Sequence, residues 1–253
     1  MTRKDGRAPE ALRTITIETG VLKFPEGSAL LKCGDTHVLC TASVDESVPD
    51  FLRGTGKGWV TAEYAMHPRA TPRRESREGR KGGGISGRSQ EIQRLIGRAL
   101  RSVVALEKLG ERTLAVDCDV LQADGGTRTA SITGGFVALA AALGSLRARG
   151  LLKKPVLRDT VAAVSVGIVK GAVVLDLPYV EDSTADVDMN VVQTGQGMLV
   201  EVQGTAEGAV FSRQMLDQMM DLATAGNAEL ARLQHAAIER AGVRWADLAV
   251  PGT

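Results

Sequence analysis

Hydrophobic and polar residues alternate along the first part of the chain, between residues 13 and 44. The alternation is clearest in the runs TITI, SALLKC and THVLCTASV, and glycines separate these runs. Because successive side chains of a strand point to opposite faces, this period of two predicts a β-meander with one buried face. A further strand is expected in GWVTAEYAM, which ends at residue 66.

Later segments have the period of an α-helix. Apolar residues recur three and four positions apart from about residue 89 to 109, and a second amphipathic stripe runs to about residue 149. Gly110 and Gly150 follow the two stripes, and glycine is the preferred residue just after a helix. Two more helices are predicted at about 212–225 and 227–241. Strands are expected between the helices, in TLAVDCDVL, VAAVSVGIVKG, AVVLDL, DVDMNVVQT and MLVEVQGT.

The order of these elements predicts an α+β protein. Strands followed by a helix occur twice, which predicts two related βα halves at about residues 1–110 and 111–241. No stretch has the composition of a linker, so residues 1–253 are expected to form one domain. Residues 66–88 have no periodicity and contain two prolines and five glycines, which predicts a mobile loop.

Composition changes this picture through the distribution of charge. The 253 residues include 31 Lys and Arg and 30 Asp and Glu, and the net charge of +1 favours no charged partner by itself. Residues 66–88, however, have a local charge of +5. An arginine-rich arm suits the phosphates of a nucleic acid, although an isolated charge run is also typical of a solvated loop. Aromatic residues make up 3% of the chain, so we expect phosphate contacts rather than base stacking. The basic residues of the loop are Arg69, Arg73, Arg74, Arg77, Arg80, Lys81 and Arg88.

The cysteines and the N-terminus indicate an intracellular setting. Cys33, Cys40 and Cys118 are widely spaced within strand-like runs, which predicts reduced, buried thiols. The N-terminal residues are polar, and no apolar run approaches the length of about 18 residues that reads as a membrane-spanning helix. We therefore expect a cytoplasmic protein without a membrane segment.

Arginine follows a glycine-rich stretch at the predicted start of two helices. Arg88 ends the run GGGISGR, and Arg128 ends DGGTR. A cation at a helix N-terminus is slightly unfavourable unless an anion is present, and glycines let backbone N–H groups approach that anion closely. One such sequence alone is more often a tight turn than an anion site. The two together favour a small anion such as phosphate, although neither matches a nucleotide-binding motif.

Five acidic residues gather in the segment 176-DLPYVEDSTADVDMN-190. Carboxylates this close repel one another unless a cation or a functional proton lies between them. Strand alternation also places residues 186, 188 and 190 on one face. The cluster favours Mg²⁺ or Mn²⁺, whereas any one of its members alone fits a turn rich in Asp and Ser. The five are Asp176, Glu181, Asp182, Asp186 and Asp188.

An anion site, a carboxylate metal site and a basic arm together fit chemistry at a phosphodiester. No Ser-His-Asp arrangement is evident as a competitor. Of the three histidines, His37 lies in a predicted strand and His235 in a predicted helix, and we interpret both as structural.

Six segments are long and specific enough to indicate a family: 3-RKDGRAPEALR-13, 32-KCGDTHVLCTASV-44, 58-GWVTAEYAMHPRAT-71, 87-GRSQEIQRLIGRALR-101, 117-DCDVLQADGGTRTASITGG-135 and 181-EDSTADVDMNVV-192. Through them the sequence resembles the ribonuclease PH family over almost its whole length. The resemblance implies a ribosomal-protein-S5-domain-2-like fold and a homohexameric ring built as a trimer of dimers. It also implies an exoribonuclease that trims the 3′ ends of transfer RNA precursors by phosphorolysis, releases nucleoside 5′-diphosphates, and adds nucleotides in the reverse reaction.

The resemblance also implies roles for particular residues. Arg88 matches the family's phosphate-binding arginine, and Gly126, Thr127 and Arg128 match its second phosphate-binding element. Asp182 and Asp188 match the acidic pair used for the metal or for proton transfer, with Asp186 as a nearby alternative. Transfer RNA binding or ring assembly is implied for Arg69, Arg73, Arg74 and Arg77.

Two other functions stay open from the sequence. One is a hydrolytic nuclease with two metal ions, and the other is a non-catalytic RNA-binding subunit of a ring. The retained glycine–arginine element and the retained acidic pair argue against a non-catalytic subunit.

Overall fold

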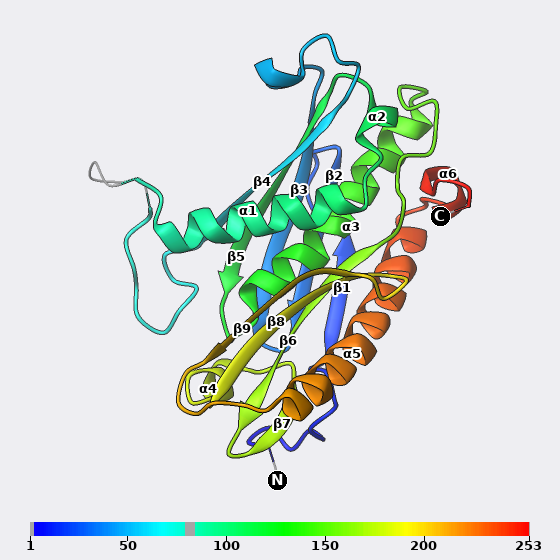
Figure 1. The fold of residues 1–253 in the computed structure, drawn as a ribbon. Helices are drawn as coiled ribbons and strands as arrows, with labels where there is room; N and C mark the ends of the chain where they lie inside the picture. The colour runs from blue at the N-terminus through cyan, green and yellow to red at the C-terminus, as the bar shows by residue number, and fades with distance from the viewer. Residues whose placement is uncertain (1–2, 79–83, 253) are drawn as a thin grey trace.

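A computed structural model describes residues 3–78 and 84–252 of the chain (Figure 1). Its first sheet has five strands in the order β1-β2-β3-β5-β4. Neighbouring strands are antiparallel except β4 and β5, which are parallel. The predicted meander is confirmed and forms three strands of this sheet. The five strands are β1 (Ile15–Thr19), β2 (Gly27–Cys33), β3 (Thr36–Asp45), β4 (Trp59–Met66) and β5 (Thr113–Gln122).

The second sheet has four antiparallel strands in the order β7-β6-β8-β9. They are β6 (Val161–Val169), β7 (Ala172–Leu175), β8 (Val187–Thr194) and β9 (Leu199–Ala206). All residues of β6 are buried, because the strand pairs on both sides and also packs against helices. The α+β class predicted from the sequence is therefore confirmed.

The predicted strand after residue 110 belongs to the first sheet. It is β5, which lies between β3 and β4 and places Cys118 opposite Cys40. The change from one sheet to the other thus comes after β5, later in the chain than the expected division near residue 110. The three cysteines are free and buried, as predicted.

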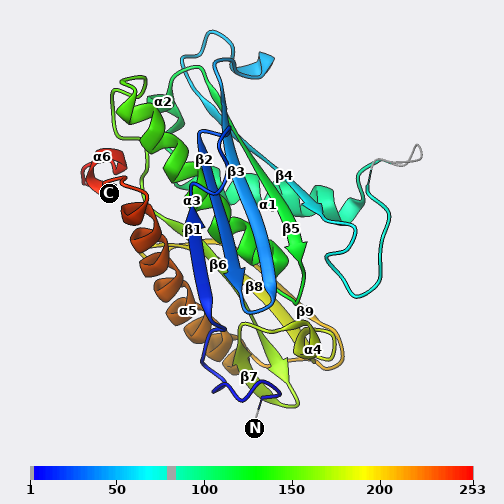
Figure 2. The same cartoon turned by 180° about the vertical axis from the view of Figure 1, so that it is seen from behind.

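Helix α3 (Thr127–Ala148) lies between the two sheets and contacts β2, β3 and β6. The expectation of an amphipathic helix is wrong here, because α3 is buried on nearly every face, including its small residues Gly134 and Gly135. An 18-residue window of α3 is apolar enough to cross a membrane, but 83% of that window is buried within the protein. In Figure 2 the first sheet is in front, with α3 and α1 (Gly87–Ser102) behind it.

The helix expected at 89–109 is interrupted. It consists of α1 and the short α2 (Leu106–Leu109). Between them the chain turns to pair with another segment: Arg158 donates its N–H to the carbonyl of Val103, and Ala105 donates to the carbonyl of Val156, both at 2.7 Å. These tertiary hydrogen bonds replace the intrahelical ones that a continuous helix would make.

The two helices predicted at 212–225 and 227–241 are one continuous helix, α5 (Arg213–Arg240). Gly226 does not end it, because this position packs against Leu175 of β7, where an added Cβ would lie 3.0 Å from a side-chain atom. Asn227 is buried and donates to the carbonyl of Val191 at 3.1 Å. The short elements are η1 (Asp50–Leu52), α4 (Tyr179–Asp182) and α6 (Trp245–Leu248).

Candidate active site

The turn before α3 depends on two glycines. Gly125 and Gly126 have φ angles of +73° and +67°, which non-glycine residues rarely adopt. A Cβ at Gly125 would lie 2.5 Å from the carbonyl oxygen of Leu177 and 2.8 Å from the nitrogen of Tyr179. Within the described residues, no side chain caps the N-terminus of α3. The first N–H groups of a long buried helix are thus available to an anion.

Thr127 and Arg128, the first two residues of α3, are each held by a side chain from another element. The hydroxyl groups of Thr127 and of Tyr64, on β4, lie 2.9 Å apart. Arg128 donates from Nη1 to the amide oxygen of Gln203, on β9, at 2.6 Å. Its Nη1 also lies 3.5 Å from Oε1 of Glu91, to which Gln203 donates at 3.0 Å. Arg128 therefore has a defined orientation, although only its carboxylate contact supplies opposite charge.

Arg88 lies in the first turn of α1, as the sequence predicted. Ser86 is the N-cap of this helix, and its hydroxyl accepts a hydrogen bond from the N–H of Ser89 at 3.2 Å. The Arg88 side chain is exposed, and its positive charge partly offsets the effect of burial, which raises the pKa of Asp182 and of Asp188. Arg128 has the same effect on both carboxyl groups. The structure thus brings together two arginines and two aspartates that lie far apart in the sequence.

Asp182 ends α4, and Asp188 is the second residue of β8. Burial raises the pKa of Asp182, against the opposing effect of the two arginines. Burial, followed by the charge of Asp182, raises the pKa of Asp188 to about 6. Oδ1 of Asp188 is buried and has no hydrogen-bond partner among the described residues. A buried carboxylate oxygen without a donor is destabilising unless a cation or a proton occupies the position.

The Asp182–Asp188 pair fits a magnesium or manganese ion. Both ions prefer oxygen ligands, and Mg²⁺ commonly binds through one or two carboxylates while it retains water and contacts substrate phosphates. The unpaired Oδ1 of Asp188 supplies a free ligand atom. No group of three or more His, Cys, Asp or Glu side chains suited to a metal occurs in the described part of the chain. The donor set therefore suits an ion shared with substrate rather than a closed structural site.

Two other members of the acidic segment have arginine partners, which corrects the interpretation that one cation explains the whole cluster. Glu181 is paired with Arg3 at 2.7 Å, and both side chains are buried. Asp176 is paired with Arg13 at 2.7 Å. Asp186 precedes β8, and its carbonyl accepts N–H groups from residues 207 and 208. Two of the five carboxylates are thus neutralised by arginines near the N-terminus.

Among the described residues, no hydrogen bond or ion pair joins the loop arginines to this group. Arg69, Arg73, Arg74 and Arg77 are all exposed on the segment 67–78, which follows β4 and projects away from the sheets (Figure 1). Arg69 donates to the carbonyls of Thr71 and Pro72 within the loop. Burial raises the pKa of Asp119 on β5, and the positive charge of Arg77 partly offsets this rise. Arg80 and Lys81 lie outside the described residues.

Sequence reasoning missed Tyr64, Gln203 and Glu91 as parts of the site. Tyr64 gives one signal, because a hydroxyl at a buried strand position needs a partner. Gln203 and Glu91 give none, since polar residues are ordinary at partly exposed strand positions and at exposed helix positions.

Comparison with known proteins adds independent findings. Residues 11–143 match the model of the 3′ exoribonuclease family, domain 1, and residues 159–226 match domain 2 of that family. The chain is 56% identical over 234 residues to the Ribonuclease PH of Syntrophomonas wolfei, covering 92% of this chain and 98% of that protein. It is 58% identical over 234 residues to the Ribonuclease PH of Moorella thermoacetica, covering 92% and 93%.

Two solved structures establish the likeness of the fold. Rice Rrp46 superposes with a TM-score of 0.75 at 20% identity, over 93% of this chain and 100% of that one. A chain of the Archaeoglobus fulgidus exosome with RNA bound to the active site superposes with a TM-score of 0.73 at 24% identity, over 91% of each chain.

Proposed function

The chain belongs to the 3′ exoribonuclease family, and from this membership we propose that it is a phosphate-dependent 3′→5′ exoribonuclease. Inorganic phosphate is its co-substrate, and RNA 3′ ends, in particular those of transfer RNA precursors, are its substrates. Each cycle releases one nucleoside 5′-diphosphate and shortens the RNA by one nucleotide. The reverse reaction extends the RNA when nucleoside diphosphate is abundant.

One observation supports this proposal above the others: Arg128, two residues after the glycine turn, and Arg88 both lie close enough to Asp182 and Asp188 for their positive charges to act on these carboxyl groups. Phosphorolysis requires an anion to attack an anion, and the two arginines reduce that repulsion. The N–H groups at the start of α3, with the hydroxyl of Thr127, orient the attacking phosphate. The Gly126–Arg128 element and Arg88 thus hold the nucleophile rather than the RNA.

The two aspartates act at the scissile phosphate and the leaving group rather than on the attacking phosphate. Asp182 and Asp188 would hold a Mg²⁺ or Mn²⁺ ion, which would supply positive charge to stabilise the scissile phosphate or the leaving 3′-oxygen. Because burial raises the pKa of Asp188 to about 6, this carboxylate can also take up and release a proton just below neutral pH. Both roles require Asp188 to lie beside the scissile phosphate.

The loop arginines Arg69, Arg73, Arg74 and Arg77 bind the RNA backbone at a distance from the scissile bond, or contribute to ring assembly. Their exposure and their position on a projecting loop support a role outside the reaction itself. The chain assembles as a homohexamer, a trimer of dimers, in the cytoplasm. This part of the proposal rests on the family resemblance.

The nature of the products tests the reaction class. A short RNA incubated with Mg²⁺ should be degraded only when phosphate is added, and the products should be nucleoside diphosphates. Turnover without phosphate that yields monophosphates would instead indicate a hydrolytic nuclease. If the Arg128→Ala variant binds transfer RNA normally and has lost no activity relative to the wild-type protein, the chain is instead a non-catalytic subunit of a ring.

A further inference from the structure

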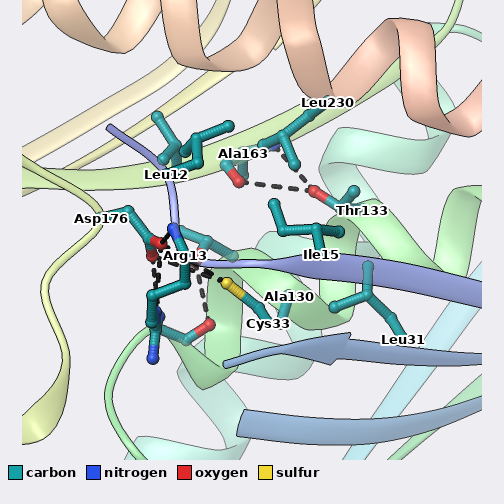
Figure 3. A pocket seen from close by; sticks show the side chains of 13 residues that line it. Leu12, Arg13, Ile15, Leu31, Cys33, Ala130, Thr133, Ala163, Asp176 and Leu230 are labelled. Carbon is teal, nitrogen blue, oxygen red and sulfur yellow. Dashed lines mark hydrogen bonds and ion pairs between the residues drawn. The ribbon is translucent and has the colours of Figure 1, made fainter. Parts of the chain in front are cut away.

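Arg13 is a buried arginine that lies behind the anion site, immediately before β1. It is 7% exposed, and its guanidinium forms a two-atom ion pair with Asp176: Nε donates to Oδ2 at 3.0 Å and Nη2 to Oδ1 at 2.7 Å. The backbone N–H of Arg13 donates to the same carboxylate at 2.7 Å. Figure 3 shows the two side chains facing each other, with Cys33 beside them.

Asp176 is held in an unusual backbone conformation to make this pair. Its φ angle is +54°, one of two positive values among the non-glycine residues described. Burial opposes its ionisation, but the hydrogen bonds and charge of Arg13 outweigh burial and lower the pKa of Asp176. The pair is therefore ionised, and backbone strain is maintained where the carboxylate meets Arg13.

The remaining donors of Arg13 go to the turn before α3. Nη1 donates to the carbonyl of Asp124 at 2.6 Å, and Nη2 lies 3.4 Å from the carbonyl of Gly125. Thr36, which is fully buried, completes the contact: its hydroxyl donates to the carbonyl of Gly125 at 2.7 Å and accepts the N–H of Asp124 at 3.0 Å.

These contacts fix the direction of two peptide groups. In a trans peptide the C=O and the following N–H point in opposite directions. Because Arg13 and Thr36 bind the carbonyls of Asp124 and Gly125, the N–H groups of Gly125 and Gly126 point away from them. The cavity on the Arg13 side of the turn is about 20 Å³, room for about one water molecule and not for phosphate. The anion must therefore approach from the opposite side, toward which these N–H groups are directed.

The same turn is joined to the helix that carries Asp182. The side chain of Asp124 accepts the N–H of Tyr179, the first residue of α4, at 3.1 Å, and lies 3.8 Å from Nη1 of Arg13. One buried arginine thus supports the anion turn directly and is linked through Asp124 to the start of α4.

We propose that Arg13, held by Asp176, and Thr36 are positioning residues that keep the turn 124–127 in its phosphate-binding conformation. This inference rests on the proposed phosphorolytic function. Neither residue touches the substrate; both act by holding carbonyl oxygens on the inner side of the turn. Their loss should weaken binding of phosphate while binding of RNA is retained.

Thr36→Val tests this with little disturbance, because it removes one hydroxyl and keeps the side-chain shape. The matched control is Thr133→Val. Thr133 is also a buried threonine whose hydroxyl contacts backbone, that of Ala163, but it lies in the second turn of α3, outside the glycine turn. We expect both variants to lose similar thermal stability. Only Thr36→Val should raise the KM for phosphate, by about threefold to tenfold, with the KM for RNA unchanged.

Arg13→Lys provides a second measurement. A lysine keeps the charge beside Asp176 but cannot also bind two carbonyls with a planar guanidinium, so the KM for phosphate should rise more than in Thr36→Val. Protection of the folded protein against heat by inorganic phosphate should weaken in the same order, which measures binding without catalysis. An equal KM for phosphate in Thr36→Val, Arg13→Lys and Thr133→Val would overturn the inference. A wild-type protein that releases no diphosphates would instead overturn the proposed function.

Discussion

The carboxyl group of Asp188 lies within the electrostatic influence of Asp182, whose negative charge adds to burial in raising its pKa to about 6. The positive charges of Arg128 and Arg88 only partly offset this effect. At neutral pH, Asp188 is therefore an ionised carboxylate that takes up a proton or a cation readily. Proton and metal compete for the same group.

This competition predicts a pH dependence that varies with the metal concentration. At limiting Mg²⁺, phosphorolysis should fall as the pH decreases through about 6, because protonated Asp188 no longer binds the ion. At higher Mg²⁺ the midpoint should move to lower pH. Rates of phosphorolysis measured across pH at two Mg²⁺ concentrations check this. A pH midpoint that is the same at both concentrations would contradict it.

Removing the charge of Asp188 should also stabilise the folded protein. Its pKa is raised from 3.8 to about 6 on folding, so between these pH values the folded state binds more protons than the unfolded state. The free energy of unfolding therefore falls as the pH rises through this range, and it stays lower above pH 6. The full shift corresponds to about 3 kcal/mol, which partial exposure reduces to about 1 to 2 kcal/mol. Asp188→Asn should therefore raise the Tm at pH 8 by about 2 to 6 °C, while activity is lost.

The pH dependence of that gain distinguishes it from a general stabilisation. At pH 4 the wild-type carboxyl is already protonated in the folded state, so the advantage of Asp188→Asn should shrink. Asp217→Asn, at an exposed ion pair on α5, is the control and should leave the Tm nearly unchanged at either pH. Thermal unfolding of the three proteins at both pH values measures the effect. A loss of stability in Asp188→Asn at pH 8 would argue against a destabilising carboxylate.

Much of the fold follows from local patterns in the sequence. The period of two in β1 to β3 and the glycine and arginine at the start of α3 each depend on neighbouring residues, so sequence alone locates them. The break after α1 and the continuity of α5 through Gly226 could not be predicted. In both places tertiary contacts, with residues 156–158 and with Leu175, override the local signal.

The acidic segment shows the same limit at the site. Its spacing indicated that carboxylates gather, but not which of them have a partner. Asp176 and Glu181 are paired with arginines more than 160 positions away, as the contacts to Arg13 and Arg3 show. Such pairing depends on how the N-terminal segment packs against β7 and α4, which no local pattern encodes. The phosphate-binding and metal-binding roles of the other residues stay predictions.

Glu91 provides a prediction about phosphate affinity. Its carboxylate lies 3.5 Å from Nη1 of Arg128 and reduces the positive potential available to an anion. Glu91→Gln removes that charge and leaves an amide oxygen that can still accept a hydrogen bond. We expect the KM for phosphate to fall by about twofold at low salt, with less change at high salt, because the pair is partly exposed.

A matched control for Glu91→Gln lies between the same two elements, α1 and β9. Glu201 is paired with Arg98 at 2.7 Å, and neither residue contacts Arg128 in the described hydrogen bonds. Glu201→Gln should leave the KM for phosphate unchanged. A KM for phosphate that rises in Glu91→Gln would indicate that the carboxylate is needed to orient Arg128 rather than competing with phosphate.

Replacing the loop arginines should weaken RNA binding in a salt-dependent way and leave the KM for phosphate unchanged. Replacing Arg69, Arg73 and Arg77 with alanine removes three positive charges, and the slope of log K against log salt should decrease by about 0.7 to 0.9 for each charge that binds an RNA phosphate. The triple variant Arg158→Ala, Arg213→Ala and Arg232→Ala is the control, since these exposed arginines form surface ion pairs elsewhere. Transfer RNA binding at several salt concentrations, with the KM for phosphate measured in parallel, separates the two roles. Unchanged RNA binding at every salt concentration, combined with altered oligomer size, would assign the loop to assembly, because interfaces between subunits would then account for its charge.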